Sequence, residues 1–172
     1  MRLAAALLAA TPALADADLA AARLTDSLAT QAMDGAIAFA FERDGCEGRT
    51  VLTQAFDGGT RTVRTVIPLG DLSTDRYEEL AFADLDIVQI GLMPVEGAEG
   101  FTAVTRIDGG TAEDHAPWLA DGGTCDASGC DHTQVTTNLP FLVRGPDSLS
   151  RSQFVLADLR TLSDACRAGG SE

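Results

Sequence analysis

Residues 50–67, TVLTQAFDGGTRTVRTVI, decide the fold of this chain. Within this stretch, residues 50–56 and 60–67 read as two strands, and only Asp57-Gly58-Gly59 separates them. An Asp-Gly pair favours the tight turn of a hairpin. The stretch therefore predicts an antiparallel β-hairpin.

The pattern continues on both sides of this hairpin. Residues 36–41 carry bulky apolar side chains on one face and alanines on the other, so together with the hairpin they predict a three-stranded meander. Further strands are predicted at residues 87–92, at 101–107 and around 133–143. Pro140 has no N–H to donate, so it marks an edge or an end of the last of these strands.

Helices are predicted near both ends of the chain. Residues 18–33 have good helix propensity and a thin apolar stripe, and residues 154–166 carry a stronger stripe. Ser150 and Gln153 are spaced as a capping box before the second helix, and Gly169 follows it as a terminator. The order of elements predicts an α+β fold: an antiparallel sheet of about five to six strands with an N-terminal helix and a C-terminal helix packed on one face, stabilised by disulfides.

The first fifteen residues resemble a secretory signal peptide. Arg2 precedes an apolar run at residues 3–10, and the segment ends in Ala13-Leu14-Ala15. The apolar run is shorter than the 20 or so residues of a membrane helix. We therefore expect a signal peptide at residues 1–15, a single domain at residues 16–172 and a periplasmic or secreted location; the alternative is an N-terminal helix of the domain itself.

The composition excludes several classes of function. Its twelve basic residues are all arginines, so lysine Schiff-base chemistry, a pyridoxal anchor and a lysine-containing phosphate loop are ruled out. With 26 acidic residues the formal net charge is −14 at pH 7, which argues against nucleic acid and anionic membrane surfaces as partners. We expect instead a protein partner in the cell envelope or outside the cell.

Four cysteines in an exported chain predict two disulfides. Cys125 and Cys130 lie in one polar, glycine-bearing segment and are expected to bridge locally, which leaves Cys46 to bridge to Cys166. Cys166 falls on the apolar stripe of the C-terminal helix, so we expect it to face the core. In the chain-entropy model the long bridge contributes about 5 kcal/mol and the short one about 2 kcal/mol.

Residues 108–132 are rich in glycine and acidic residues and read as a surface loop pinned by its own disulfide. One alternative to the local disulfide is a zinc or copper site built from His115, Cys125, Cys130 and His132. Another is a calcium site that uses carboxylates of this segment. The metal-ligand candidates are His115, His132, Asp108 and Asp114, and Glu113 and Asp121 complete the acidic set considered for calcium.

The same segment holds the candidate catalytic and contact residues. His132 and Ser128 are the best candidates for a hydrolase, because the disulfide would hold them on a rigid loop. The apolar cluster Pro117-Trp118-Leu119 is expected to fold back on the sheet, with a protein contact as the alternative. The leading hypothesis is a small exported, non-catalytic binding module without a cofactor, and the alternative is an exported hydrolase or metal-binding protein that uses residues 108–132.

Overall fold

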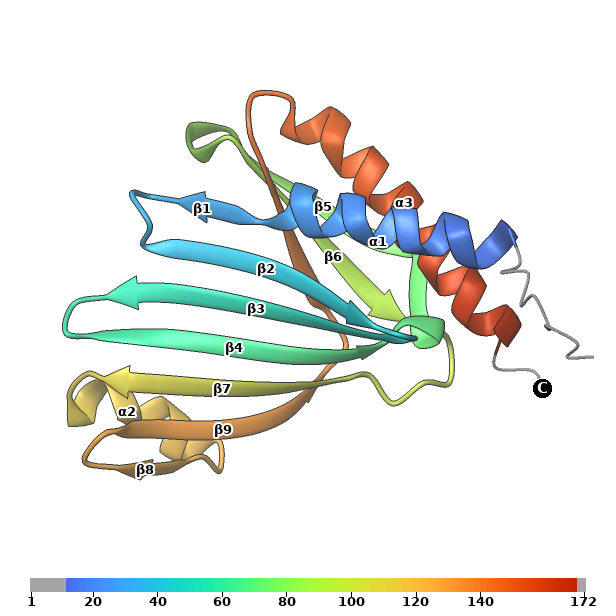
Figure 1. Ribbon diagram of the computed structural model, residues 1–172. Helices are drawn as coiled ribbons and strands as arrows, with labels where there is room; N and C mark the ends of the chain where they lie inside the picture. Colours follow the sequence, from blue (N-terminus) through green and yellow to red (C-terminus); the bar gives the residue numbers. More distant parts are fainter. Residues whose placement is uncertain (1–11, 170–172) are drawn as a thin grey trace, which may run out of the picture.

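The computed structural model describes residues 12–169, which form two antiparallel sheets and three helices (Figure 1). The larger sheet has seven strands, which in spatial order are β1 (Thr30–Ala32), β2 (Ile37–Asp44), β3 (Glu47–Phe56), β4 (Gly59–Pro68), β7 (Phe101–Gly109), β9 (Gly129–Thr136) and β8 (Thr124–Asp126). The smaller sheet has three, in the order β10 (Leu139–Arg144), β6 (Ile87–Pro94) and β5 (Leu72–Phe82). The helices are α1 (Pro12–Leu28), α2 (Ala112–Ala120) and α3 (Ser148–Gly169), and single 3-10 turns occur at Leu69–Asp71 and Ala83–Leu85. The predicted α+β class is confirmed.

The predicted hairpin forms strands β3 and β4. Gln54 pairs with Arg61 and Phe56 pairs with Gly59, so the strands turn at Asp57 and Gly58. Gly58 has a φ of 83°, a left-handed conformation that explains why the turn needs glycine there. Strand β2 pairs with β3 in antiparallel register, which confirms the predicted three-stranded meander.

The chain passes from one sheet to the other between β9 and β10. Residues 133–143, predicted as a single strand, are therefore divided between the two sheets. At the crossing, the Thr136 hydroxyl donates to the Asn138 carbonyl at 2.9 Å and accepts from the Asn138 N–H at 3.3 Å. These local bonds replace the ladder bonds that a continuing strand would make. Pro140 then lies in β10, an edge strand of the small sheet, as its missing N–H predicts.

The prediction of five to six strands in one sheet was wrong in number and arrangement. Strand β5 was missed because its residues after Thr74 are exposed along the sheet edge, so no alternation of burial marks them in the sequence. A register shift between Ser73 and Tyr77 further obscures the period of two. The short strands β1 and β8 lie at the two edges of the large sheet and contain only three residues each.

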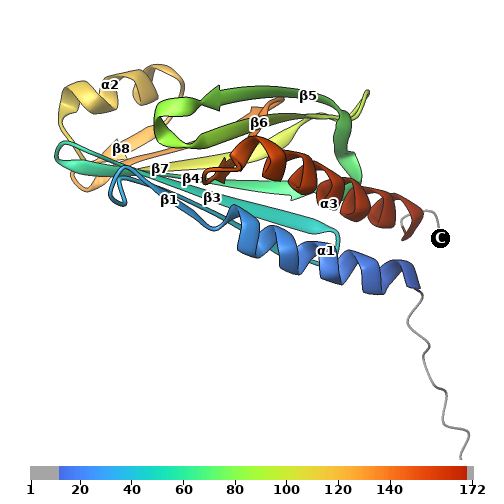
Figure 2. The ribbon, with the colours of Figure 1, turned by 90° about the horizontal axis from the view of Figure 1, so that it is seen from above.

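Helices α1 and α3 lie side by side at one end of the molecule (Figures 1 and 2). The predicted N-terminal helix ends at Leu28, five residues before the expected boundary, because residues 30–32 pair with β2 instead. Helix α3 begins at Ser148, so Ser150 lies in its first turn and does not cap it. Residues 1–11 of the predicted signal peptide lie outside the described residues, while residues 12–15 form the start of α1.

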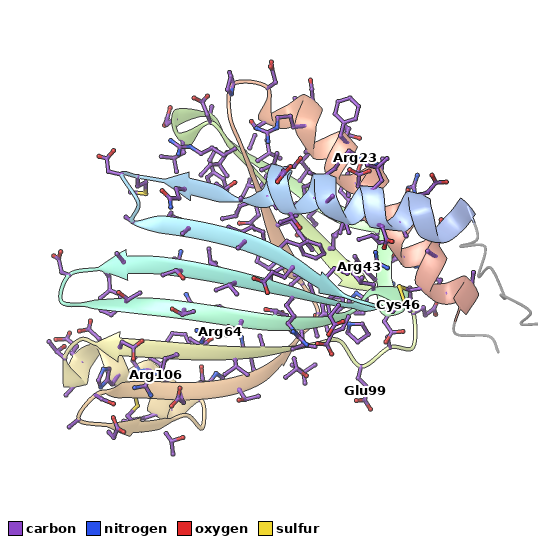
Figure 3. All side chains as sticks on the ribbon, in the orientation of Figure 1. Arg23, Arg43, Cys46, Arg64, Glu99 and Arg106 are labelled. Atoms are coloured by element: carbon purple, nitrogen blue, oxygen red, sulfur yellow. A yellow bond between two sulfur atoms is a disulfide. The ribbon has the colours of Figure 1, made fainter. Side chains whose placement is uncertain are left out.

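The core of the helical end is apolar and closed by a disulfide. Leu24 of α1 and Leu159 of α3 are fully buried in one cluster with Phe141 of β10. Cys166, buried on α3 as predicted, is bonded to Cys46 in the β2–β3 turn, with the two Cα atoms 5.5 Å apart (Figure 3 labels Cys46). No helix within residues 12–169 is long and apolar enough to cross a membrane.

Candidate functional site

Residues 108–132 are folded, contrary to the prediction of a surface loop. The segment contains the end of β7, helix α2, and strands β8 and β9. Helix α2 begins with a capping box in which the Thr111 hydroxyl accepts from the Asp114 N–H, and the Asp114 carboxylate accepts from the Thr111 N–H at 2.7 Å. The bond from the Thr111 N–H to the carboxylate, together with one from the Thr111 hydroxyl at 2.7 Å, lowers the pKa of Asp114 below its ordinary value. This helix was not predicted, because the segment has too few apolar residues to form an apolar stripe. A local capping network stabilises its start instead.

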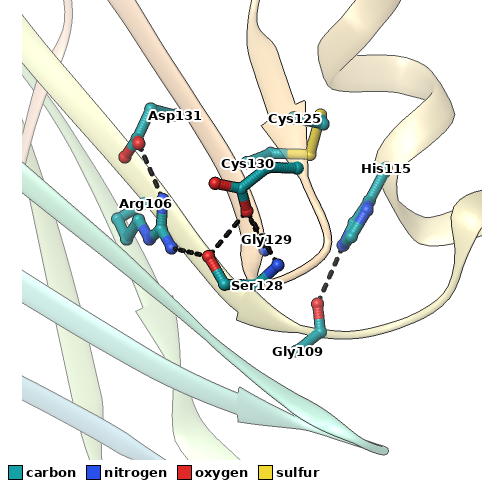
Figure 4. The surroundings of a disulfide bond; sticks show 9 residues. Arg106, Gly109, His115, Cys125, Ser128, Gly129, Cys130 and Asp131 are labelled. Atoms are coloured by element: carbon teal, nitrogen blue, oxygen red, sulfur yellow. Dashed lines mark hydrogen bonds and ion pairs between the residues drawn. A yellow bond between two sulfur atoms is a disulfide. The ribbon is translucent and has the colours of Figure 1, made fainter.

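Arg106 on β7 is joined to β9 and to the β8–β9 turn by a network of ion pairs and hydrogen bonds (Figure 4). Arg106 on β7 lies 2.8 Å from the Asp108 carboxylate and 2.7 Å from that of Asp131, and these two acids raise its pKa. In the β8–β9 turn the Asp126 carboxylate accepts from the Ser128 N–H at 2.7 Å and from the Ser128 hydroxyl at 2.6 Å, which lowers the pKa of Asp126. Of the acids that were candidate metal ligands, Asp108 and Asp114 are thus engaged in structural bonds.

The hydrolase candidates Ser128 and His132 are not brought together. The Ser128 hydroxyl donates to Asp126 and accepts from Arg106 at 3.0 Å, so within the described chain its hydrogen-bond partners include no histidine base. His132 lies in β9 and its Nε2 is 3.0 Å from the Asp121 carbonyl oxygen. The predicted hydrolase requires the imidazole of His132 within hydrogen-bond distance of the Ser128 hydroxyl, and this arrangement does not supply it.

The predicted metal ligands are only partly brought together. Among the residues from 12 to 169, one group of three potential ligands has its atoms within 4.8 Å of one another: His115, Cys125 and Cys130. The two sulfurs form the predicted local disulfide. His132, Asp108 and Asp114 do not belong to this group, so neither the four-ligand zinc or copper site nor the acidic calcium site is assembled as predicted.

Trp118 of α2 folds back on the large sheet. For this residue of the Pro117-Trp118-Leu119 cluster, the expected packing on the sheet is therefore found. Its ring lies 5.0 Å from the guanidinium carbon of Arg61 on β4 and 5.9 Å from the ring of His132 on β9. Figure 2 shows that α2 and the small sheet lie on the same side of the large sheet. We call this side the inner face, and we call Arg61, Thr105, His132 and Trp118 the inner-face site.

Three buried side-chain atoms of the inner-face site have no hydrogen-bond partner within the described chain: Arg61 Nε, Thr105 Oγ1 and His132 Nδ1. They come from three adjacent strands, because β7 lies between β4 and β9 and Thr105 pairs directly with His132. Thr105 is 1% exposed and His132 is 8% exposed. A buried polar atom without a partner costs about 1–3 kcal/mol, so three such atoms on one face mark this place as a candidate binding site.

The chemistry that each group offers can be deduced from its neighbours. Because the Asp121 carbonyl can only accept, His132 Nε2 carries the hydrogen and Nδ1 of the neutral ring presents a lone pair. Arg61 Nε is a donor, and burial lowers the pKa of this guanidinium from its ordinary value. The Thr105 hydroxyl can donate or accept. The site therefore offers one cationic donor, one acceptor and one group that can be either.

Two cavities meet at Arg61. One, of about 170 Å³, extends along the inner face and is lined by Arg61 together with uncharged residues: Phe39, Thr50, Leu52, Val63, Thr65, Ala103, Gln134, Thr136, Asn138 and Pro140. The other, of about 180 Å³, lies under α2 and is lined by Phe56, Arg61, Ile107, Asp114 and Trp118. Among the described residues, Arg61 is the only charged one that lines the first cavity, so the charge in that mixed polar and apolar space is positive.

Sequence reasoning identified His132 and Trp118 but missed Arg61 and Thr105. Arg61 precedes Val63 by two residues, so the period of two already placed its charge on the same face as apolar side chains. A charge at an inward position is the signal that was available for this residue. No comparable signal marks Thr105, because threonine is common on both faces of strands.

No protein-family model, no curated protein and no solved structure matches this chain.

Proposed function

We propose that this protein is an exported, non-catalytic binding module that holds a small carboxylate-bearing ligand, or the carboxylate end of a larger one, in the inner-face site. The single observation that carries the proposal is Arg61. Its guanidinium is half-buried against Trp118, its Nε has no partner within residues 12–169, and it faces a cavity with no other charge. A carboxylate matches a guanidinium in charge and planar geometry.

The other arginines support this interpretation by contrast. Arg61 Nη1 makes only a long contact of 3.5 Å with the Gln54 side-chain oxygen, and no ion pair with an acid is found for it in the described chain. Six other arginines are within ion-pair distance of acids: Arg23, Arg43, Arg49, Arg106, Arg160 and Arg167. Of the rest in the described chain, Arg64, Arg76 and Arg144 are exposed to water, and Arg151 donates to the backbone carbonyls of Arg144 and Ser27. In a chain with 26 acidic residues, a half-buried arginine without an acidic partner is best explained by an external anion.

The size of the cavities limits the ligand. A space of about 170 Å³ accepts a small organic acid, and the adjoining space of about 180 Å³, which the acidic Asp114 also lines, is less suited to a carboxylate. Thr50, Gln134 and Thr136 line the first cavity and supply neutral hydrogen-bonding groups for the rest of the ligand. We therefore propose a ligand with one carboxylate and further polar atoms.

Export is part of the proposal. Two disulfides in a chain of this size fit an oxidising compartment, and residues 1–15 have the pattern of a signal peptide. We propose a periplasmic or secreted protein. Cell fractionation followed by mass spectrometry of the mature N-terminus tests this part, and an uncleaved chain in the cytoplasm would contradict it.

The ligand proposal is tested by NMR titration of the intact protein with a panel of small carboxylic acids and the matching primary amides. We expect carboxylates, and not the amides, to shift the Trp118 indole N–H and the β4 amides. Arg61→Gln should weaken binding by about 10- to 100-fold, because a charge-assisted hydrogen bond contributes about 1.5–3 kcal/mol.

Arg64→Gln is the matched control. Arg64 lies on the same strand, three residues away, and is exposed (Figure 3). This variant removes the same charge from the molecule without touching the inner face, so affinity should stay at the wild-type level. Equal losses in the two variants, or acids and amides that bind alike, would contradict a carboxylate site at Arg61.

A further inference from the structure

We propose that opening the Cys125–Cys130 disulfide creates a metal site in which His115, Cys125 and Cys130 bind a divalent thiophilic ion of the zinc type. This site lies on α2 and the β8–β9 hairpin and is independent of the ligand proposed for Arg61. Each of the three residues offers a ligand atom, and these atoms lie within 4.8 Å of one another. Thiolate and imidazole are the ligands that zinc prefers.

The position of His115 does not depend on the disulfide. Its Nε2 is 2.8 Å from the carbonyl oxygen of Gly109, and the capping box at Thr111 and Asp114 holds the start of α2 (Figure 4). Because a carbonyl can only accept, Nε2 carries the hydrogen and Nδ1 keeps its lone pair. A metal-binding histidine usually donates its second N–H to such a carbonyl or to a carboxylate, and this contact is already in place.

The two cysteines also stay opposed when the bond between them is open. Cys125 and Cys130 are direct partners in the antiparallel pair of β8 and β9, with Cα atoms 4.0 Å apart. The turn between these strands is held by Asp126, which accepts from Ser128 and from the Gly129 N–H at 3.2 Å. Two sulfurs on one zinc ion, each at about 2.3 Å, are about 3.7 Å apart, a separation that rotation of the two side chains allows.

Opening the disulfide requires a reductant. An external dithiol gives two electrons and two protons to the Cys125–Cys130 bond and becomes a disulfide itself. Each of the two thiols then releases one proton when the divalent ion binds, and His115 binds as neutral imidazole. Three protein ligands leave one position of a tetrahedral ion for water or a further ligand. The oxidised protein has no thiolates to offer and does not bind the ion.

The test is a titration of the full chain with Co²⁺, which reports thiolate ligands by sulfur-to-metal charge-transfer absorption, followed by displacement with Zn²⁺. We expect the protein reduced with a phosphine to bind one equivalent, and the oxidised protein to bind none. His115→Ala should weaken binding by at least about 100-fold, since even the loss of an outer partner of a metal ligand costs 10- to 100-fold.

The double variant Cys125→Ser with Cys130→Ser, reduced in the same way, is the matched control. It keeps Cys46 and Cys166 and should show no charge-transfer band. Binding that is the same in this control as in the wild type, or that His115→Ala leaves unchanged, would overturn the proposal.

Circular dichroism of the same samples follows the fold. If complete reduction unfolds the chain, the titration is repeated on protein in which only the Cys125–Cys130 bond has been opened, identified by the mass of its alkylated peptide. We expect that form to be folded and to bind the ion. Opening of this bond only together with global unfolding would overturn the proposal as well.

Discussion

The two ends of the molecule differ in what packs beside their disulfides. At one end Cys46–Cys166 joins the β2–β3 turn to α3, and at the other Cys125–Cys130 joins β8 to β9. At the first end, fully buried side chains such as Leu24 and Leu159 form an apolar core beneath α1 and α3, and the groove of about 680 Å³ between the two helices lies at the surface. At the second, α2 has no fully buried side chain, and its neighbours are held by capping bonds and by the pairs of Arg106. The first end is stabilised mainly by apolar burial, the second by hydrogen bonds and charge.

This difference explains where a binding site can be built. Apolar packing leaves little unused space, whereas a region held by directional bonds can leave polar atoms such as Thr105 Oγ1 without partners. Unpartnered buried atoms such as those of the inner-face site reduce stability. Perturbations of the two ends should therefore have clearly different effects on folding and on binding.

The largest expected difference is between the two disulfides. Replacing Cys46 and Cys166 together by serine should lower the free energy of unfolding by about 5 kcal/mol, because the bond closes a loop of 120 residues. The same change at Cys125 and Cys130, with a separation of 5, should cost about 2 kcal/mol. Urea denaturation measures both values, and equal losses would contradict the assignment of stability to the helical end.

A leucine truncation at each end gives the next largest effect. Leu159→Ala removes a fully buried side chain and should destabilise the protein by about 3 kcal/mol. Leu119→Ala on α2 removes a side chain that is 53% exposed and should change stability by less than about 0.5 kcal/mol. Thermal unfolding of the two variants provides the comparison, and similar midpoints would show that α2 is packed as firmly as α3.

Thr105→Val separates stability from binding. Valine has a similar shape and removes a buried hydroxyl that has no partner in the described chain, so stability should rise by about 1 kcal/mol without ligand. Carboxylate binding should weaken in the same variant. Thr102→Val, on an exposed position of the same strand, is the control and should change neither quantity. A loss of stability in Thr105→Val comparable to a core truncation would indicate that the hydroxyl is satisfied.

The smallest expected effect is a dependence on pH confined to the α2 end. The pKa values of Asp114 and Asp126 are lowered by the hydrogen bonds they accept, so both carboxylates stabilise the fold fully above the ordinary aspartate pKa of about 3.8. That contribution is lost as the pH falls below this value and through the lowered pKa of the folded state. Hydrogen exchange, corrected for its intrinsic pH dependence, should show α2 and the β8–β9 turn opening in acid before α3. Asp126→Asn should remove this difference at the turn, and an unchanged profile would contradict a stabilising role for the ionised Asp126 carboxylate.

Much of the fold could be predicted because its signals are local. The two runs of strand-forming residues and the Asp-Gly turn in residues 50–67 specify β3 and β4 without reference to the rest of the chain. The burial of Cys166 and its pairing with Cys46 followed from one helical stripe and from the proximity of the other two cysteines. The division into two sheets could not be predicted in this way, because it depends on the tertiary positions of the three connections that pass between the sheets, β4 to β5, β6 to β7 and β9 to β10.

The candidate site was harder to predict for a related reason. His115 and the two cysteines were recognised as possible ligands by residue type. That His132 does not lie with them depends on the position of α2, a helix with few apolar residues to mark it in the sequence. Arg61 is separated by 57 residues of sequence from Trp118, so only the folded sheet shows that they meet. Contacts between distant residues of this kind leave no periodic trace in a single sequence.

The Cys46–Cys166 bond also makes the chain a closed ring with a tail. Strands β3 to β10, and with them Arg61 and Trp118, lie inside the ring, whereas α1, β1 and β2 lie outside it. A protease that cuts the exposed connection at Glu96–Gly97 leaves every fragment covalently joined until a reductant is added. A cut at the exposed turn Met33–Asp34 instead frees α1 and β1, which have no covalent link to the rest. Gel mobility with and without reductant therefore reports which part of the molecule has opened.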